Sequence, residues 1–198
     1  MPVFTTIKPF ILGSASPRRQ ELLASLGLEF EVVPAPAEVQ PKKAELPEIY
    51  AQRAATGKGF AVQKGLDAGR RRLPILSADT IVVLDGVILG KPKSHGQAFE
   101  ILQKLAGRTH TVITACALLQ DGQLDELSLR SQVTIWDAPA ETLLRYADST
   151  EPMDKAGAYA AQGQGAFMVR GINGSWSNVV GLPLSEVAGL LLKRGIIA

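Results

Sequence analysis

The sequence predicts an α/β protein, because the strands and helices expected from its patterns alternate along the chain. An apolar run at residues 10–12 precedes a helical pattern that Pro17 opens, and a second short strand is expected at 30–33. The chain has 198 residues, of which 46% are hydrophobic and 20% charged, so it is long enough to bury a core. We therefore expect one domain over residues 1–198, with at most a small appended lobe.

The first expected helix begins with the wrong sign of charge. Ser16 and Pro17 are expected as its N-cap and first position and Gly27 as its end, which places Arg18 and Arg19 in the first turn. The helix dipole disfavours a cation there by roughly 0.3–1 kcal/mol. A phosphate held by the arginines and the free backbone N–H groups would explain this arrangement. The alternative is that both arginines point into solvent.

The remaining elements follow from periodicity and turn residues. Asp85-Gly86 and Asp121-Gly122 are signals for two-residue hairpin turns. A proline-rich loop at 34–47, which contains Glu38, is long enough to be functional. Helices are expected at 48–63, 95–105, 139–146 and 183–195, and strands at 75–78, 81–84, 87–89, 109–119, 127–136 and 166–170.

Asp79 is the most informative single residue, because it interrupts two apolar strand segments. A carboxylate in that position must be solvated in a cleft, paired, or bound to a cation. The alternative is an aspartate that bonds its own turn backbone. Lys91, after the return strand, could bring a cation to the same cleft, whereas Lys58, between two glycines, is by itself typical of a solvated lysine.

Composition excludes several other classes. A net charge of +2 gives no wide basic face for nucleic acid, and the run Arg70–Arg72 is expected to be a solvated loop. Cys116 is the only cysteine, and we expect it reduced and buried. His95 and His110 are the only histidines, too few for a histidine-rich metal site, and His110 is expected in the core. No apolar run approaches bilayer length and no signal peptide is recognisable, so we expect a cytoplasmic protein without membrane contact.

The chemistry that remains uses oxygen ligands and cations. Carboxylates without imidazole or thiolate suit Mg²⁺ or Mn²⁺, held through one or two carboxylates and substrate phosphates. Arginine and lysine bind phosphoryl oxygens, and an aspartate can accept a proton from attacking water. These patterns predict metal-dependent attack on a phosphoanhydride by residues drawn from Asp79, Glu38, Asp154, Arg18, Arg19, Lys58, Lys91 and Lys155.

Three stretches together resemble the Maf family of nucleoside triphosphate pyrophosphatases, once described as septum-formation inhibitors. They are residues 14–23 (Ser-Ala-Ser-Pro-Arg-Arg-Gln-Glu-Leu-Leu), Ala78-Asp79-Thr80 with Gly90-Lys91-Pro92, and residues 151–159 with Gln162-Gly163. Each motif is weak alone, but together they cover nearly the whole chain in order.

The resemblance implies an α/β fold with a mixed twisted sheet and flanking helices, related to the inosine triphosphate pyrophosphatases, with two lobes around a central cleft. It implies a homodimer that hydrolyses a nucleoside triphosphate to the monophosphate and pyrophosphate with a divalent cation, Mg²⁺ or Mn²⁺. By this resemblance Asp79 is the proton acceptor, Arg19, Lys58 and Lys91 are phosphate or catalytic contacts, Ser14 contacts substrate, and Glu38 and Asp79 hold metal.

The resemblance also bears on the base. Arg18, Thr80 and Gln162 correspond to positions that set base choice, and these residue types resemble the branch acting on dTTP, UTP and modified pyrimidine nucleotides. The glutamine amide can both donate to and accept from a pyrimidine edge. The same chemistry on methylated GTP or another purine triphosphate is the alternative within the family.

One departure from the family pattern keeps a further alternative open. Glu38 is followed by Val39, where the family usually has two adjacent acids, and Lys58 lies in a looser, glycine-flanked setting than usual. A nucleotide-binding division regulator with little turnover is therefore an alternative. A single-strand nucleic-acid binder acting through Arg70–Arg72 is poorly supported, because no aromatic residues interleave with those charges.

Overall fold

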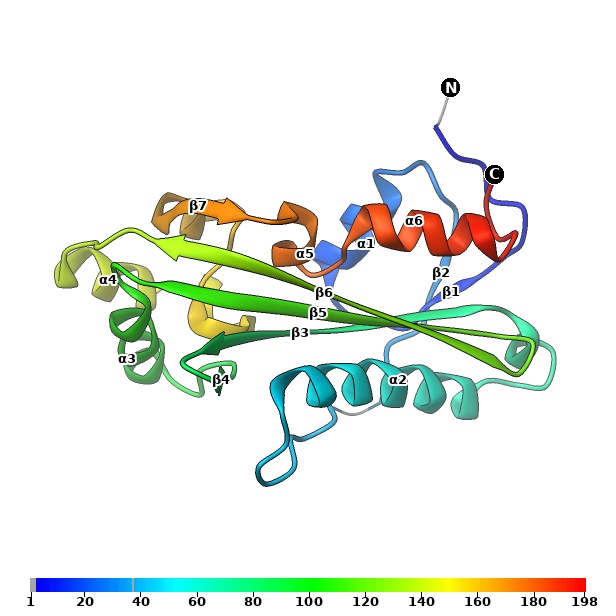
Figure 1. Ribbon diagram of the computed structural model, residues 1–198, viewed down its shortest axis with the longest axis horizontal. Coiled ribbons are helices and arrows are strands. Elements are labelled where there is room, and N and C mark those ends of the chain that lie inside the picture. The colour runs from blue at the N-terminus through cyan, green and yellow to red at the C-terminus, as the bar shows by residue number, and fades with distance from the viewer. Residues whose placement is uncertain (1–2, 37) are drawn as a thin grey trace. The chain divides into compact units, whose positions relative to one another are not determined.

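The computed structural model describes residues 3–36 and 38–198 (Figure 1). The chain divides into two compact units, which are described separately. Unit 1 takes the described residues of Met1–Asp79, Thr114–Leu129 and Gly181–Ala198, and unit 2 takes Thr80–Ile113 and Arg130–Val180. The long strands β3 (Ile75–Leu84), β5 (Thr109–Gln120) and β6 (Gln123–Ile135) contribute residues to both units.

Unit 1 contains a mixed sheet of β1 (Ile11–Leu12), β2 (Glu31–Val32), β3, β5 and β6, in the strand order β2-β1-β3-β5-β6. The short strand β1 pairs in parallel with both β2 and β3. The helices of unit 1 are α1 (Pro17–Ala24), α2 (Pro47–Gly65), the 3₁₀ helix η1 (Arg70–Arg72) and α6 (Leu184–Lys193).

In unit 2 the same long strands gain antiparallel partners, β4 on β3 and β7 on β6. Its elements are β4 (Val87–Leu89), α3 (His95–Leu105), α4 (Ala140–Ala147), the 3₁₀ helices η2 (Glu151–Asp154), η3 (Ala156–Ala158) and η4 (Gly163–Met168), β7 (Val169–Asn173) and α5 (Trp176–Val180). Parallel and antiparallel pairs with flanking helices make this the mixed α/β architecture that the sequence predicts.

Both hairpin turns are confirmed. The aspartates Asp85 and Asp121 have φ of 51° and 52°, and Gly86 and Gly122 have φ of 78° and 76°. Two successive positive φ angles are typical of a type I′ turn, which favours Asp-Gly and matches the strand twist.

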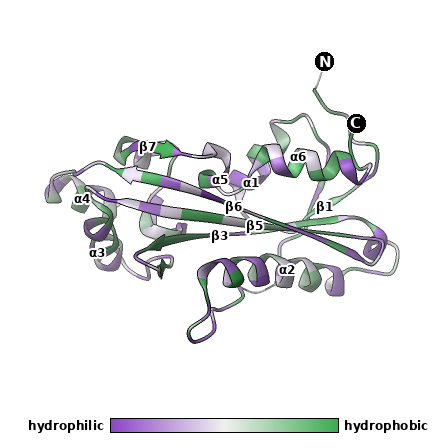
Figure 2. Cartoon of the chain, viewed as in Figure 1, coloured by the Kyte–Doolittle hydropathy of each residue, from purple (hydrophilic) through white to green (hydrophobic). Residues whose placement is uncertain are grey.

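Each unit has its own apolar core. In unit 1, Val62 and Leu66 of α2 pack with residues of β1, β3 and β5. Figure 2 shows hydrophobic and hydrophilic positions alternating along α2, as expected for a helix with one face buried. In unit 2, α3 buries its expected apolar face, and His110 is buried in the core with Nε2 2.8 Å from the Tyr159 hydroxyl. Among the described residues, no helix is long and apolar enough to cross a membrane.

Three expected boundaries were wrong. Asp79 does not interrupt a strand but lies within the continuous β3, because a lysine from α2 supplies its partner and the backbone ladder need not break. The strand expected from 127 begins at Gln123. Exposed and half-buried positions alternate from its start, but the first half-buried position is Asp125 rather than an apolar residue, so no apolar signal marks it. The strand expected at 166–170 is found at 169–173, after the 3₁₀ turn η4.

Candidate active site

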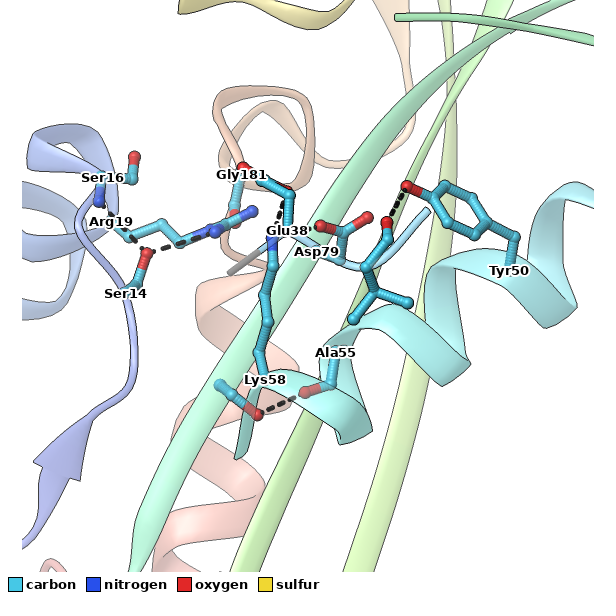
Figure 3. Close-up of polar contacts among 11 residues, drawn as sticks. Ser14, Ser16, Arg19, Glu38, Tyr50, Ala55, Lys58, Asp79 and Gly181 are labelled. Atoms are coloured by element: carbon cyan, nitrogen blue, oxygen red, sulfur yellow. Dashed lines mark hydrogen bonds and ion pairs between the residues drawn. The ribbon is translucent and has the colours of Figure 1, made fainter. Parts of the chain in front are cut away.

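The link between β1 and α1 holds Arg19 in a fixed direction. Ser14 Oγ accepts hydrogen bonds from the Ser16 backbone N–H and from Arg19 Nη1, both at 3.2 Å (Figure 3). Ser16 occupies the N-cap position but makes no side-chain cap bond. Arg19 Nε donates to the Gly181 carbonyl at 2.8 Å, so the solvent-exposed alternative is wrong for Arg19.

The charge of Arg19 is partly desolvated. Burial lowers the pKa of its guanidinium, and the Asp79 carboxylate opposes that effect. The Glu38 carboxylate acts in the same direction as Asp79, and Arg18 in the opposite one. Because arginine remains charged in proteins, this is a fixed cation within electrostatic reach of two acids.

A close approach of α2 to β3 brings the next cation into place. Ser77 Oγ on β3 donates to the Ala55 carbonyl of α2 at 2.8 Å. A Cβ added at Gly59 would lie 2.8 Å from Ser77 Oγ and 3.2 Å from Leu119 Cδ1, so only glycine fits without rearrangement. The glycine that weakens the helix therefore lets it lie against the strand that carries Asp79.

Lys58 links two carboxylates from different parts of unit 1. Its Nζ lies 2.6 Å from Asp79 Oδ1 and 3.0 Å from Glu38 Oε2. The Lys58 and Asp79 side chains are only 11% and 10% exposed, whereas that of Glu38 is 55% exposed. Removing one partner of a charge pair buried to this degree leaves an unpaired buried charge, which is strongly destabilising. Lys58 and Asp79 therefore depend on each other for charge compensation in the folded protein.

Tyr50 approaches the same carboxylates from α2 and was missed by sequence reasoning. Its hydroxyl donates to the Val39 carbonyl at 2.9 Å (Figure 3). Burial, with the charges of Asp79 and Glu38, raises the pKa of Tyr50 to about 12, so it stays a donor at physiological pH. Its spacing of eight residues from Lys58 places both on one helix face, which was the available signal.

Arg18 is half-buried on α1 of unit 1, and unit 2 carries the other predicted residues. Thr80 is half-buried in β3, Lys91 is exposed after β4, and Gln162 is half-buried just before η4. The Gly157 N–H donates to the Gly90 carbonyl at 3.2 Å, which joins the segment preceding Lys91 to η3.

Glu151 shapes the turn that holds Gln162. Its carboxylate accepts from the backbone N–H groups of Gln164 at 3.0 Å and Gly165 at 2.7 Å, and from the Tyr146 hydroxyl at 2.7 Å. Burial raises the pKa of Glu151, but these three hydrogen bonds outweigh it and the net shift is downward. Glu151 lies within the sequence motif at 151–159, but the motif did not predict this role.

Asp79 and Glu38 are the two carboxylates that the sequence singles out for a divalent cation. Within the residues that the structure describes, no group of three or more His, Cys, Asp or Glu side chains could hold a metal. Asp79 and Glu38 nevertheless present two carboxylates to one ammonium nitrogen. Two carboxylates fit Mg²⁺ or Mn²⁺ when phosphate and water oxygens complete the coordination shell.

Comparison with known proteins decides the family. A family model described as Maf-like protein matches residues 9–194. The chain belongs to the Maf family. The family match spans residues of both units.

Curated Maf relatives cover almost the whole chain. A dTTP/UTP pyrophosphatase from Nitratidesulfovibrio vulgaris is 47% identical over 98% of this chain and 91% of its own length. Proteins of the same name from Oleidesulfovibrio alaskensis and Escherichia coli are each 44% identical, over 98% and 91% of this chain and 89% and 90% of their own lengths. The solved Staphylococcus aureus Ham1 protein aligns with a TM-score of 0.45 and 14% identity, covering 66% of this chain and 73% of its own, which is too partial to decide the fold.

Proposed function

We propose that the protein hydrolyses dTTP and UTP to the nucleoside monophosphate and pyrophosphate. The observation that carries the reaction class is the buried Asp79 carboxylate, bonded to Lys58 and within electrostatic reach of Arg19. The choice of nucleotide is supported by the relatives, which bear the name dTTP/UTP pyrophosphatase at 44–47% identity.

In the proposed reaction a water oxygen forms a bond to the α-phosphorus, the bond from the α-phosphorus to the oxygen bridging the α- and β-phosphates breaks, and pyrophosphate leaves with that oxygen. Asp79 accepts the proton of the attacking water, as a positioned carboxylate can. Arg19 is held by Ser14 and Gly181 and neutralises phosphoryl charge, and Lys58 does the same beside Asp79. Lys91 is proposed as a further phosphate contact.

A divalent cation, Mg²⁺ or Mn²⁺, is part of the proposal. Asp79 and Glu38 would hold it, and it would supply charge neutralisation and activation of water. Val39 stands where the family usually has a second acid. Lys58 still has two carboxylate partners, because Glu38 itself contacts its ammonium nitrogen. Binding of Mn²⁺ without nucleotide, followed by electron paramagnetic resonance, should weaken in Glu38→Gln; equal binding would remove Glu38 from the ligand set.

Base selection is assigned to Arg18, Thr80 and Gln162. The Gln162 amide offers a donor and an acceptor, which suits the edge of uracil or thymine. The half-buried position of Gln162, before a turn fixed by Glu151, supports a side chain presented in a defined direction.

A triphosphate panel that measures pyrophosphate release with Mg²⁺ or Mn²⁺ tests the function. We expect dTTP and UTP to be hydrolysed faster than purine triphosphates or N7-methylated GTP. Faster hydrolysis of a purine triphosphate would support the proposed reaction but contradict the proposed preference for thymine and uracil. Tight dTTP binding without pyrophosphate release in saturating metal would instead favour a nucleotide-binding division regulator.

We also propose a homodimer that works in the cytoplasm. The dimer is supported by the family resemblance, and the cytoplasmic setting by the nucleotide substrate proposed above. Sedimentation equilibrium at micromolar concentration tests the dimer, and a fluorescent fusion tests the location.

A further inference from the structure

Glu38 reaches the buried pair from a segment without helix or strand. Residues 38–45 precede α2, and the Glu38 carboxylate extends to Lys58 Nζ at 3.0 Å. A segment without helix or strand lacks the regular backbone hydrogen bonds of those elements. The positions of its side chains therefore depend on contacts with neighbouring elements.

Tyr50 and Arg53 of α2 supply those contacts. The Tyr50 hydroxyl donates to the Val39 carbonyl at 2.9 Å, and Arg53 Nη2 donates to the Gln40 carbonyl at 2.8 Å. Arg53 also bonds both Glu45 carboxylate oxygens at 2.6 Å, in the two-pronged geometry that arginine makes with a carboxylate.

These contacts are tied to one another as well as to the segment. The Arg53 guanidinium lies 5.7 Å from the centre of the Tyr50 ring, within cation–π range. Glu45 Oε2 accepts the Lys42 backbone N–H at 2.9 Å, so the same carboxylate closes the segment on itself. The pKa of Glu45 is lowered to about 2, chiefly by its hydrogen bond from Arg53.

A third contact lies next to Lys58 along the helix. A Cβ added at Gly57 would lie 3.3 Å from Val39 Cγ2, so the valine side chain faces this glycine. Tyr50, Arg53, Gly57 and Lys58 follow the i, i+3, i+7, i+8 spacing of one helix face. One face of α2 therefore carries both the fastening contacts and the lysine that meets Glu38.

We propose that Tyr50 and Arg53 are positioning residues that fasten residues 38–45 to α2 and thereby set where the Glu38 carboxylate lies. Tyr50 acts through the backbone of Val39, one residue from Glu38, and Arg53 through Gln40 and Glu45. This inference rests on the proposed function insofar as Glu38 acts in catalysis. Neither side chain is assigned a contact with substrate.

A double-mutant cycle tests whether Tyr50 acts through Glu38. Tyr50→Phe removes one hydroxyl, and we expect kcat/KM for dTTP to fall about fivefold, the effect of one such hydrogen bond. In a Glu38→Gln background the same change should cost less than twofold, because the carboxylate to be positioned is gone. An equal fall in both backgrounds would show a general structural role and overturn the proposal.

Hydrogen exchange gives a readout that does not depend on activity. Exchange of the backbone amides in 38–45 should quicken in Tyr50→Phe and in Arg53→Gln, while the β3 amides keep their protection. Arg53→Lys should not restore protection, because an ammonium cannot make the two-pronged contact with Glu45. Unchanged exchange in 38–45 in both variants would overturn the proposal even if no triphosphate were hydrolysed, which separates its failure from that of the proposed function.

Gln52→Met is the matched control on the same helix. Gln52 Nε2 donates to the Cys116 carbonyl at 3.3 Å and to Thr56 Oγ1 at 3.4 Å, and it is assigned no contact with residues 38–45. We expect exchange in 38–45 and kcat/KM to remain within twofold of the unmodified protein. A control effect as large as that of Tyr50→Phe would show that any loss on α2 disturbs the segment, and would overturn the proposal.

Discussion

Asp79 in unit 1 is a buried carboxylate and Glu151 in unit 2 is a half-buried one, and their hydrogen-bond partners differ. Asp79 Oδ1 meets the ammonium of Lys58 at 2.6 Å, whereas Glu151 meets two backbone N–H groups and a tyrosine hydroxyl. An ammonium on a four-carbon stem can move when substrate or metal arrives, but backbone amides cannot. A carboxylate with a movable partner is suited to chemistry, and one with fixed partners is suited to shaping a loop.

The largest expected effect is at Asp79. Asp79→Asn removes the proposed proton acceptor while keeping the shape of the side chain, so kcat should fall by roughly 10²–10⁴-fold. Pyrophosphate release from dTTP measures the loss, and nucleotide binding by calorimetry should be retained. A rate equal to that of the unmodified protein would show that Asp79 is not the base.

Arg19 and Arg18 test whether the side chain fixed by Ser14 and Gly181 is the phosphate contact. Arg19→Ala should lower kcat/KM about 100-fold for every triphosphate, since it removes a charge-assisted contact. Arg18→Ala should mainly change the ratio of dTTP to purine turnover. Loss of all activity in both variants, with unchanged base preference in Arg18→Ala, would contradict the division of roles.

Glu151→Gln should lower stability, because it weakens the contacts that fix the turn before β7. The amide replaces a charged acceptor of three hydrogen bonds and places an N–H₂ group against other donors, so we expect a loss of about 1.5–3 kcal/mol of unfolding free energy. Urea denaturation at pH 7 measures it. A melting curve unchanged by Glu151→Gln would remove the distinction between the two carboxylates.

The pH dependence of the Glu151 contribution has a definite sign. Its folded pKa is below the ordinary value of 4.5, so the stabilisation is fully present above pH 4.5 and is lost as pH falls through the folded pKa. The gap in unfolding free energy between the unmodified protein and Glu151→Gln should therefore be constant from pH 7 to about 5 and shrink below about pH 4. A gap that widens on acidification would contradict the lowered pKa.

The smallest expected change is at Gln162, on the turn that Glu151 shapes. Gln162→Glu replaces a donor and acceptor with acceptors alone, which suits a cationic methylated guanine. We expect the ratio of dTTP to N7-methylated GTP turnover to fall about tenfold, without a comparable loss of stability. A uniform loss for all substrates would assign Gln162 to general binding instead.

Local signals in the sequence predicted much of the fold. The Asp-Gly turns and the helix at 95–105 were found where expected, because turn conformation, capping and apolar periodicity are set by neighbouring residues. The start of β6 was missed because its first half-buried position is the polar Asp125, whereas the apolar Leu124 is exposed. The strand expected at 166–170 begins later than predicted. The Glu151 carboxylate binds the backbone amides of Gln164 and Gly165, 13 and 14 residues along the chain, and holds this part of the chain in a turn.

In the candidate site, likewise, the key residues were predicted from the sequence but their contact partners were not. Ser14, Arg19, Lys58, Asp79 and Glu38 were singled out by charge and motif, and the structure places them in one unit with the contacts described above. Their partners could not be predicted from local pattern: the Gly181 carbonyl is 162 residues from Arg19, and the Val39 carbonyl is held by Tyr50 across 11 residues. Such contacts depend on the assembled fold rather than on neighbours in sequence.

Gly59 and Ser77 share one small volume between α2 and β3, where an added Cβ would lie 2.8 Å from the hydroxyl oxygen. These two positions should therefore covary among relatives. A relative with alanine or a larger residue at the first position should have glycine or alanine at the second, and it must satisfy the helix carbonyl that Ser77 now bonds by other means. The spacing between α2 and β3 that brings Lys58 to Asp79 thus depends on residues 59 and 77 together. A larger residue at position 59 requires a smaller one at position 77.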